Sequence, residues 1–595
     1  MPTPPALTTL KSATSRADLA SLLNIDLKNL TYLLFVQKAD KKYISFTIKK
    51  KNGGSREINA PNQSLKSLQQ KTAKLLEECL QEISASSGKK NSASHGFRKD
   101  RSIQTNASAH RNRRYVFNVD LKNFFPTITF PRIRGYLISN ADFQLHKDVA
   151  TAVAQIACLD SKLPQGSPLS PIISNMIGSI LDFHLTKLAA ANSCFYTRYA
   201  DDLTFSTNRK SFPASIAKAN PENSNLWQVG QALLKIITKC GFVVNDDKTR
   251  LQYKTSRQQV TGLVVNKKVN ATIEYRRAIR SYVHSLVTQG KFTIPFTEEK
   301  EDGSFIKSFY PGTIKQLHGM LGFVHATESV YRTNLENHPE NYPNKQVKPG
   351  ATGNLAVFRR FLLYTRFFAS DRPLFICEGK TDNVYLSNAV HQLKDFFPEF
   401  VQKNKDGKQV LAFDLFKYAR RHRKKRNIYL PNFSTAKILG NSSGGGPNLA
   451  NLLMTYYNEQ KKFKGPKGSC PIIFIVDNDS GGKVVLSKMK EIAEAKKYPH
   501  PYNDDFYHVF GNTYIVPVRS LTKKFSSIED LFTDEDKKKT VDGKPFDFSK
   551  SADGKLTAGK ASFAYDYVAK NPKDVNFSGF MPLLKILRQI VVNHV

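Results

Sequence analysis

The alternation of apolar and polar positions predicts a chain built from helices and short strands. Residues 1–50 are mainly helical in pattern before the strand-like run YISFTIKKK, and KNGG at 51–54 is typical of a hairpin turn. Residues 62–87 carry apolar residues at helical spacing without Pro or Gly, which predicts a helix. From Tyr115 to Val265, short apolar runs alternate with helical stretches, as expected of an α+β domain.

The second half of the chain follows a different pattern. Residues 274–370 are mainly helical in pattern, with a Gly/Pro-containing interruption near 303–313. At Asp371 the pattern restarts with the apolar run PLFICEG, and CPIIFIVDNDSGG follows at 470–482. Each run predicts a buried strand that ends in a turn, so we expect a domain boundary at Asp371.

Two unusual stretches lie between these strands. RRHRKKR at 420–426 is strongly electropositive, which favours nucleic-acid contact over an ordinary solvated charge run. GNSSGGGPN at 440–448 lacks the Lys-Ser/Thr pair of a phosphate-binding P-loop, so we expect a flexible loop. We interpret both stretches as an insertion.

The composition narrows the class of protein. The 595 residues include 89 Lys+Arg and 50 Asp+Glu, a formal net charge of +39. Residues 1–370 contribute +26 and residues 371–595 contribute +13, so the charge is not confined to one tail. Such an excess indicates contact with a polyanion, nucleic acid before an anionic membrane surface, while a merely well-solvated surface is the plainer alternative.

Other classes are disfavoured. No window of 18 apolar residues occurs, so we expect no membrane span, and the start MPTPPALTTL lacks the pattern of a secretory signal. The cysteines lie far apart, without the spacing of a disulfide scaffold or a zinc site; they are residues 79, 158, 194, 240, 377 and 470. A reducing cytoplasm fits this pattern.

The strongest chemistry lies in FYTRYADDLTFST at 195–207. This run predicts two strands joined by a tight turn, with Asp201 and Asp202 at the tip. Upstream, RYVFNVDLKNFFPTI ends an apolar run at Asp120, which can lie beside Asp201 because neighbouring strands are about 5 Å apart. Adjacent carboxylates repel unless cations neutralise them, and two Mg²⁺ ions there would activate an attacking hydroxyl and stabilise departing pyrophosphate.

YADD at 199–202 and LPQGSPLSP at 163–171 resemble the core of a reverse transcriptase. REINAP at 56–61 and HGFRKDRS at 95–102 resemble its fingers signatures, and the resemblance covers about residues 30–330. It implies an α+β right-hand polymerase with fingers, palm and helical thumb. We expect an N-terminal and fingers region at 1–114, a palm at 115–270, a thumb and linker at 271–370 and a further domain at 371–595.

The resemblance also implies roles for individual residues. The metal-binding and catalytic triad would be Asp120, Asp201 and Asp202. The residues that contact the deoxynucleoside triphosphate would be Arg56, Gln165, Gly166 and Phe125, the last as the gate against a 2′-OH.

Two short strings resemble those of retron reverse transcriptases, rather than group II intron or diversity-generating types. NASAH at 106–110 matches N-A-x-x-H and VTG at 260–262 matches the retron V-T-G. The resemblance implies copying of a structured noncoding RNA into branched, multicopy single-stranded DNA in a bacterial cytoplasm. The implied RNA-binding residues are Asn106, His110, Val260, Thr261 and Gly262.

The expected thumb carries Arg276 and Arg280, which share one face of a predicted helix. On the functional interpretation they contact phosphates of the template–product duplex, which is recognised by its shape. A solvated helix face is the equally weighted alternative.

A second acidic set follows Asp371. Glu378 ends one predicted buried strand, and Asp477 and Asp479 end another. Acidic groups at the carboxyl ends of strands in an α/β sheet lie where such sheets bind ligands, and together they make an oxygen-rich site for Mg²⁺ or Mn²⁺. Ordinary strand-end aspartates are the alternative.

This set resembles a Toprim domain, the module of topoisomerases, primases and OLD-family nucleases. The resemblance implies a mainly parallel sheet, catalytic and metal-binding roles for Glu378, Asp477 and Asp479, and Glu529 as a further metal ligand, with Asp530 beside it as an alternative. The 98 residues between Glu378 and Asp477 exceed what a compact Toprim domain needs.

The leading hypothesis is a retron reverse transcriptase fused to a Toprim nuclease that attacks host or phage nucleic acid in antiphage defence. One alternative is a mobile-element or repair polymerase whose Toprim domain processes its own product. Another is a Toprim domain that only binds the RNA–DNA hybrid. The sequence does not determine the nuclease target, the phage trigger or the subunit number, so a homo-oligomer stays open.

Overall fold

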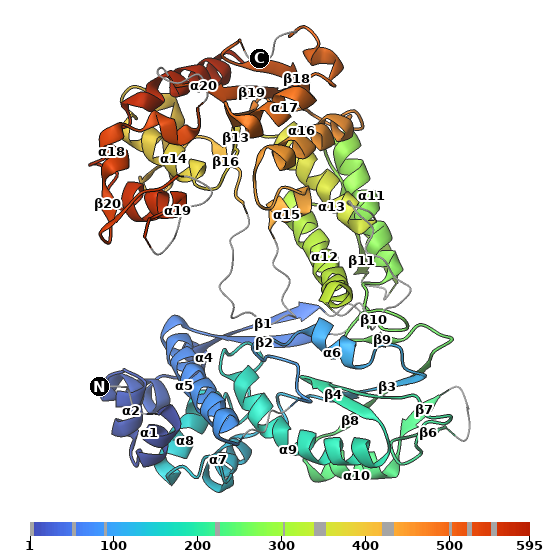
Figure 1. The fold of residues 1–595 in the computed structure, drawn as a ribbon. Coiled ribbons are helices and arrows are strands. Elements are labelled where there is room, and N and C mark those ends of the chain that lie inside the picture. Colours follow the sequence, from blue (N-terminus) through green and yellow to red (C-terminus); the bar gives the residue numbers. More distant parts are fainter. Residues whose placement is uncertain are drawn as a thin grey trace. The chain divides into compact units, whose positions relative to one another are not determined.

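The computed structural model describes the chain in ten segments that form two compact units, Met1–Thr272 and Ile273–Val595 (Figure 1). Each unit is described by itself. The described residues are 5–49, 55–87, 92–220, 226–300, 304–337, 353–418, 434–498, 503–520, 526–548 and 556–594.

The first unit is built around a four-stranded antiparallel sheet with the strand order β4-β5-β3-β8. Helix α9 lies on one side of the sheet, with α10 beside it, and α6 lies on the other side (Figure 1). The strands are β3 (Tyr115–Leu121), β4 (Phe195–Tyr199), β5 (Asp202–Thr207) and β8 (Val244–Tyr253), and the helices are α6 (Ile103–Ala109), α9 (Ser170–Ala191) and α10 (Gln231–Lys239).

A two-stranded antiparallel hairpin and a group of helices complete this unit. The hairpin consists of β1 (Tyr43–Lys49) and β2 (Ser55–Pro61), which confirms the strand predicted for YISFTIKKK, while KNGG falls outside the described residues. The helix predicted at 62–87 is confirmed as α5 (Gln63–Ser87). The other helices include α1 (Ala6–Ser12), α2 (Arg16–Leu22), α3 (Leu27–Thr31), α7 (Phe130–Ser139) and α8 (Lys147–Ala157).

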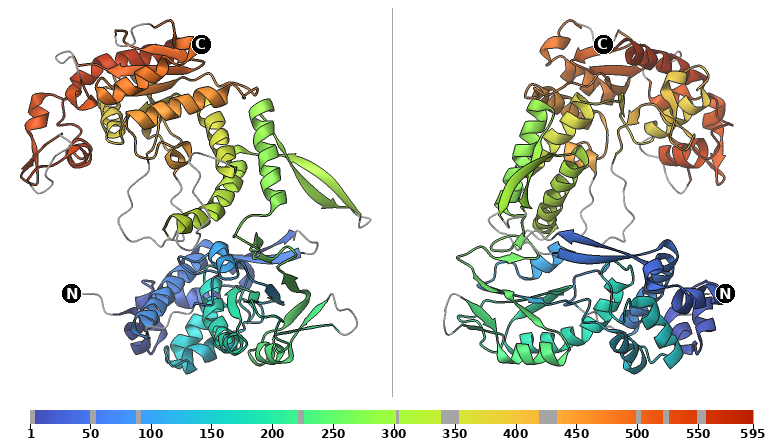
Figure 2. Two further views of the ribbon diagram at one scale, coloured as in Figure 1. Left: turned by 45° about the vertical axis from the view of Figure 1, so that its right-hand side comes forward. Right: turned by 180° about the vertical axis from the view of Figure 1, so that it is seen from behind.

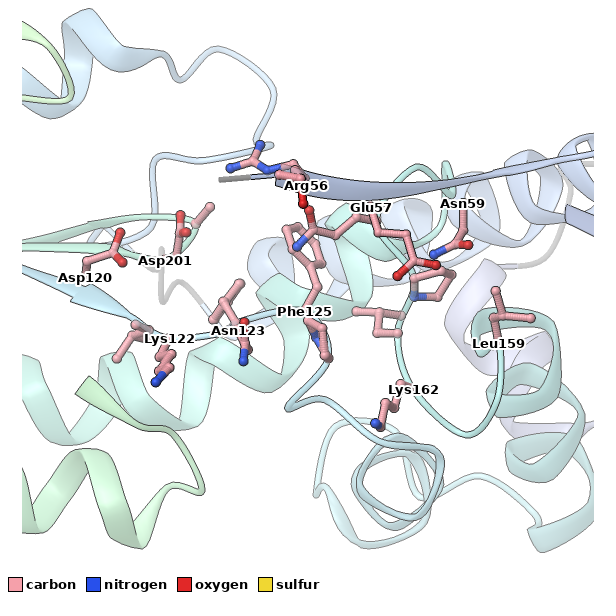
Figure 3. A pocket seen from close by; sticks show the side chains of 18 of the residues that line it. Arg56, Glu57, Asn59, Asp120, Lys122, Asn123, Phe125, Leu159, Lys162 and Asp201 are labelled. Atoms are coloured by element: carbon pink, nitrogen blue, oxygen red, sulfur yellow. The ribbon is translucent and has the colours of Figure 1, made fainter. Parts of the chain in front are cut away.

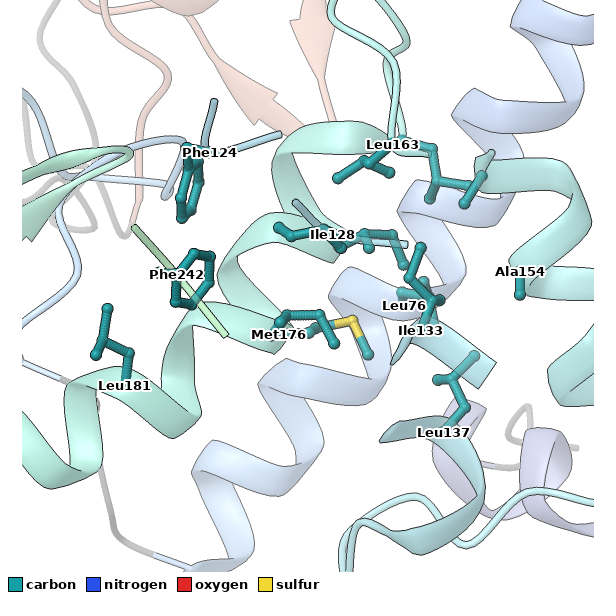
Figure 4. Close-up of a cluster of buried hydrophobic side chains, with 14 of the residues drawn as sticks. Leu76, Phe124, Ile128, Ile133, Leu137, Ala154, Leu163, Met176, Leu181 and Phe242 are labelled. Carbon is teal, nitrogen blue, oxygen red and sulfur yellow. The ribbon is translucent and has the colours of Figure 1, made fainter. Parts of the chain in front are cut away.

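One hydrophobic cluster joins the sheet to these helices (Figure 4). Phe124 and Phe242 stack with ring centroids 5.5 Å apart, beside Leu181 and Met176 of α9. Leu76 of α5 belongs to the same cluster, so α5 and the sheet share a core. This core fixes the end of β3 that carries Asp120.

The second unit begins with helices and a long antiparallel hairpin. The segment predicted to be mainly helical contains α11 (Ile273–Gln289), α12 (Ile314–Asn337) and α13 (Asn354–Leu363). The interruption is longer than predicted, because β11 (Thr293–Glu299) and β12 (Phe305–Pro311) pair over their whole length between α11 and α12 (Figure 2). Helix α13 packs against α11, α12, α15 (Thr435–Leu439) and α16 (Gly446–Gln460), so these helices and the following sheet belong to one unit.

The second unit contains a five-stranded sheet with the strand order β16-β13-β17-β19-β18. The first four strands are parallel and β18 is antiparallel to β19. The strands are β13 (Leu374–Cys377), β16 (Asp414–Leu415), β17 (Ile472–Asp477), β18 (Tyr507–Phe510) and β19 (Thr513–Val518). A mainly parallel sheet is therefore present, and β13 and β17 end side by side.

Helices cover this sheet. α14 (Asp382–Gln392) and α20 (Met581–Asn593) share a hydrophobic cluster with Phe375 and Ile473 of the sheet. α17 (Ser480–Met489) packs on β17 and on α16.

No single helix among the described residues is long and apolar enough to cross a membrane. One bent pair of short helices, Arg16–Leu22 with Leu27–Val36, passes the same test of length and composition when the two are taken together.

Candidate functional sites

The β4–β5 hairpin presents two adjacent carboxylates at its tip. Tyr199 pairs with Asp202, so Ala200 and Asp201 form the connection. Ala200 has a φ of 55°, a conformation that costs a non-glycine residue energy. Asp120 on β3 pairs directly with Asp202, so the register brings three carboxylates to the same end of the sheet.

All three aspartates line one cavity of about 1120 Å³ in the first unit (Figure 3). Arg56 on β2 and Phe125 after β3 line the same cavity, and the backbone of Gln165 ties its loop to β2, because the Asn59 amide donates to the Gln165 carbonyl at 2.7 Å. The cavity thus combines carboxylates on one side with a cation and an aromatic ring on the other.

Gly166 is the next residue of the loop that the Gln165 carbonyl ties to β2. Its φ is 118°, and an added Cβ would stand 2.7 Å from the carbonyl oxygen of Asn59. A side chain at this position would push β2 away from the loop, so glycine is required for their close approach.

Burial and mutual repulsion disfavour charge on the paired aspartates. Burial, followed by the neighbouring charges of Asp201 and Asp120, raises the pKa of Asp202 to about 7. Burial and Asp120 also raise the pKa of Asp201. A bound cation would remove this penalty.

Two residues that the sequence analysis missed hold Asp120. The Asn245 amide donates to Asp120 Oδ2 at 2.9 Å, and Lys248 Nζ donates to its two carboxylate oxygens at 3.2 and 3.1 Å. Both residues come from β8, whose pairing with β3 shifts register between Asn118 and Asp120. The run NDDK at 245–248 is the sequence signal for these two residues. Their contact with Asp120 depends on the register shift, so it could not be predicted from that run.

The chemistry of the donors fits Mg²⁺, which prefers carboxylate oxygens. Within the described residues, no three His, Cys, Asp or Glu side chains are grouped closely enough to hold an ion by themselves. This agrees with the usual binding of Mg²⁺ through one or two carboxylates together with waters and substrate phosphates. Asp120, Asp201 and Asp202 would hold the ion here together with waters and the phosphates of the substrate.

A second acidic cluster lies at the carboxyl ends of β13 and β17. Glu378 follows β13, where its Oε1 accepts from the Gly446 amide at 3.0 Å and its Oε2 from the Asp477 amide at 3.3 Å. Burial, followed by Asp382, Glu378 and Glu529, raises the pKa of Asp477 to about 8. Burial also raises the pKa of Glu378.

Asp382, Glu529 and Lys560 complete this cluster. Burial and the charge of Glu529 raise the pKa of Asp382 to about 6. Lys560 Nζ lies 3.1 Å from Glu529 Oε2 and is the cation that contacts this buried carboxylate. Neither Asp382 nor Lys560 was predicted as a site residue, because Asp382 is the first residue of α14 and Lys560 is distant in sequence.

Two of the predicted acidic residues are engaged as helix caps. Asp479 Oδ1 accepts from the amides of Gly481 and Gly482 at 2.7 and 3.1 Å, which caps α17. Asp530 forms a capping box with Ser527 at the short helix Ile528–Leu531. Glu529, in contrast, pairs with Lys560, and its charge raises the pKa of Asp382.

The Gly-rich stretch, predicted as a flexible loop, contacts this cluster, and its last residues belong to α16. The Gly445 amide donates to the Glu378 carbonyl at 2.9 Å, and α16 begins at Gly446. Gly444 has a φ of 80°, and an added Cβ would collide with the Glu378 carbonyl oxygen. Glycines are therefore needed for close contact with Glu378, whereas the basic run at 420–426 lies outside the described residues.

Residues 48–266 match the family model described as "Reverse transcriptase (RNA-dependent DNA polymerase)". Retron Ec86 reverse transcriptase of Escherichia coli is 32% identical over 272 residues, which cover 45% of this chain and 77% of that protein. The chain belongs to the retron reverse transcriptases.

Other relatives match less of their own length. Retron Mx162 reverse transcriptase of Myxococcus xanthus is 33% identical over 342 residues, 54% of this chain, and the chain spans only 65% of that relative. Among solved structures, a Candida albicans telomerase in complex with a telomeric RNA fragment has a TM-score of 0.30 at 11% identity, covering 54% of this chain and 63% of that one, a likeness too weak to describe the fold. The second acidic cluster lies outside the family match at 48–266.

In this retron reverse transcriptase, Asn106 and His110 are fully buried. Thr197 Oγ1 donates to Asn106 Oδ1 at 2.6 Å, and the two ring nitrogens of His110 lie 2.7 Å from Ser206 Oγ and Thr197 Oγ1. Both side chains attach α6 to β4 and β5, so the structure gives them an internal packing role and no surface for RNA.

The V-T-G triplet forms a tight turn between β9 (Gln259–Val260) and β10 (Leu263–Val264). Thr261 and Gly262 have φ values of 46° and 79°, and Thr261 Oγ1 donates to the Ile103 carbonyl on α6 at 3.4 Å. The two retron strings, about 150 residues apart in sequence, therefore pack against each other.

The two thumb arginines lie on α11 in the second unit. Arg280 is exposed and its Nη2 donates to Asn354 Oδ1 of α13 at 3.3 Å, while Arg276 is half-buried one turn earlier. Arg280 thus keeps further donors available at the surface.

Proposed function

We propose that this chain is an RNA-directed DNA polymerase that copies a structured retron RNA into branched, multicopy single-stranded DNA in the bacterial cytoplasm. The observation that carries the proposal is the convergence of Asp120, Asp201 and Asp202 on one cavity that Arg56 and Phe125 also line. Membership of the retron family supports the choice of RNA template and deoxynucleoside triphosphates.

The chain's own groups have distinct tasks in this proposal. Mg²⁺ bound by the aspartates supplies charge stabilisation and an activated hydroxyl for phosphoryl transfer. Arg56 supplies positive charge for the triphosphate, and Phe125 closes the cavity against a ribose 2′-OH. Phe125 packs against Phe97 and Phe124, whose ring centroids lie 6.2 and 5.5 Å from its own, so two aromatic rings hold the gate residue in position.

Primer extension on an RNA template tests the polymerase. Asp201→Asn with Asp202→Asn should abolish DNA synthesis, because an amide has no negative charge to neutralise the cations and is a weaker ligand than a carboxylate. Asp246→Asn is the matched control, since Asp246 is exposed on β8 outside the cavity lining. Equal loss in the control, or full activity in the double variant, would contradict the proposed site.

We further propose that residues 371–595 contain a Toprim metal-dependent nuclease that acts on host or phage nucleic acid as an antiphage effector. The supporting observation is the placement of Glu378 and Asp477 at the ends of adjacent parallel strands, with Asp382 and Glu529 beside them. The basic charge of this part of the chain favours a polyanionic substrate.

The nuclease proposal is tested separately from the polymerase. Glu378→Ala should leave DNA synthesis intact while removing toxicity and phage protection. Asp406→Asn is the control, because Asp406 is exposed between the paired strands Val401–Lys403 and Gln409–Leu411. If Glu378→Ala protected cells normally, the effector proposal would fail and a binding-only domain would be favoured.

A further inference from the structure

A buried ion pair lies directly behind the β4–β5 hairpin. Arg198 of β4 is fully buried, and Asp182 of α9 is 3% exposed. Arg198 Nε and Nη2 donate to the two oxygens of Asp182 at 2.8 Å each, and Tyr196 Oη donates to Asp182 Oδ1 at 2.9 Å. This fork geometry holds the guanidinium in one orientation.

The same guanidinium reaches the turn that carries the carboxylates. Arg198 Nη1 donates to the carbonyl oxygen of Ala200 at 3.2 Å. Ala200 is the residue with positive φ, immediately before Asp201. A charged donor at this carbonyl therefore stabilises a peptide whose backbone conformation is otherwise unfavourable.

The backbone of Arg198 fixes a second segment against the hairpin. The Arg198 amide donates to the Ala93 carbonyl, and the His95 amide donates to the Arg198 carbonyl, both at 2.8 Å. Gly96 then crosses the turn so closely that an added Cβ would stand 2.6 Å from the Ala200 nitrogen. Arg198 thus contacts Ala200 by its side chain and holds in place the segment that covers it.

The helix behind the pair is shaped to admit the guanidinium. An added Cβ at Gly178 of α9 would stand 2.7 Å from the guanidinium carbon of Arg198. Any side chain at Gly178 would therefore displace Arg198 without removing its charge.

We propose that Arg198, oriented by Asp182 and given room by Gly178, is a positioning residue that fixes the Ala200–Asp201 turn and so the direction of the acidic pair toward the cavity. This role rests on the proposed polymerase function. The pair is buried, and removing one partner alone would leave an uncompensated charge, so the test must separate positioning from folding.

The decisive variant is the double change Asp182→Leu with Arg198→Met in the full chain. Replacing both partners of a buried pair by apolar residues of similar volume commonly preserves folding, but it removes the donor to Ala200. We expect an almost unchanged midpoint of thermal unfolding and an unchanged KM for deoxynucleotide, with kcat reduced about 10- to 100-fold, as for misplaced catalytic groups. Mn²⁺ binding, measured by electron paramagnetic resonance without nucleotide, should weaken in parallel.

Two single variants complete the test. Tyr196→Phe removes a hydrogen bond to Asp182 but keeps the donor to Ala200, so kcat and Mn²⁺ binding should stay at wild-type values. Gly178→Ala displaces the guanidinium and should lower both.

A folded double variant with wild-type kcat and Mn²⁺ affinity would overturn the proposal. If the double variant did not fold, Arg198→Lys would test the proposal instead, because a single ammonium cannot reproduce the fork and also reach Ala200. Wild-type kcat and Mn²⁺ affinity in folded Arg198→Lys would overturn the proposal equally. If wild-type chain extended no primer, the polymerase proposal would fail, and the Mn²⁺ measurement would still test the turn.

Discussion

Lys248 is the cation in direct contact with the acidic triad in the first unit. It lies 3.1 Å from Asp120 Oδ2, and it opposes the effect of burial by lowering the pKa values of Asp201 and Asp202. Its position on β8 makes the charge of the triad depend on the register of a neighbouring strand.

Lys248→Met should therefore shift the pH dependence of DNA synthesis. Without Lys248, the pKa of Asp202 in the metal-free site, already raised to about 7, rises further, so less of the carboxylate is ionised to receive Mg²⁺ at neutral pH. The acid limb of the pH–rate profile should move to higher pH, each unit costing about tenfold in the ionised fraction on that limb. Lys239→Met, an exposed change at the end of α10, should leave the profile in place; the same profile in both variants would refute the assignment.

His110 makes the stability of the first unit depend on pH. Burial, then His95 and Arg113, lowers its pKa to about 3, whereas an unfolded histidine titrates near 6.5. The neutral ring stabilises the fold fully above pH 6.5, and this contribution falls as pH drops toward 3, because the unfolded chain then binds the proton.

Between pH 7 and pH 5, the contribution of His110 to the free energy of unfolding should fall by about 2 kcal/mol. Urea denaturation at the two pH values measures this loss, and His110→Gln should show a smaller one. Exposed His284→Gln should keep the wild-type dependence. Identical losses in His110→Gln and the wild type would contradict the assignment.

The sequence predicts only in part which acidic side chains belong to the two acidic clusters. The apolar flanks of YADD were sufficient to predict the hairpin and its two carboxylates. Asp477 and Asp479 look equivalent in sequence because both come at the end of the same apolar run. Their different environments depend on α17 starting at Ser480, which makes Asp479 its cap.

At the scale of elements, the Gly444–Gly446 connection is built to contact the end of β13. Gly444 and Gly445 have φ values of 80° and 89°, but only an added Cβ at Gly444 meets Glu378, since nothing lies within 4 Å of one at Gly445. The two glycines therefore form a matched pair for mutation.

Both Gly444→Ala and Gly445→Ala should lose about 1–3 kcal/mol of stability from backbone strain at a positive φ. Gly444→Ala should lose more, and should also remove the effector activity, because its methyl group displaces Glu378. Thermal unfolding together with a phage-protection assay distinguishes the two. Equal behaviour of both variants would show that the loop does not position Glu378.

Elements with one clear periodicity were predictable, and elements defined by long-range pairing were not. The helix at 63–87 follows directly from its apolar spacing. The β11–β12 hairpin was not predicted, since only a Gly/Pro-containing interruption between helices was expected there. Both faces of the hairpin carry apolar residues, including the exposed Phe296 and Phe309, so its strands show no simple alternation of apolar and polar positions. The shift between β3 and β8 that brings Lys248 to Asp120 leaves no local signal at all.

At the scale of the whole molecule, the chain contains two acidic clusters in two separate units. The family match at 48–266 surrounds the first cluster, and the second lies outside it. A net charge of +39, distributed over both parts, suits a chain in which each cluster acts on nucleic acid. The two clusters should therefore be separable by mutation, as the Asp201/Asp202 and Glu378 variants test.

The most direct test of the account is the nucleic acid that co-purifies with the chain expressed together with its upstream noncoding RNA. We expect single-stranded DNA joined covalently to RNA, released by debranching enzyme, and absent from the Asp201→Asn/Asp202→Asn variant. An active preparation without RNA-linked DNA, or the same DNA bound to the double variant, would contradict the central claim that this chain makes branched retron DNA at Asp120, Asp201 and Asp202.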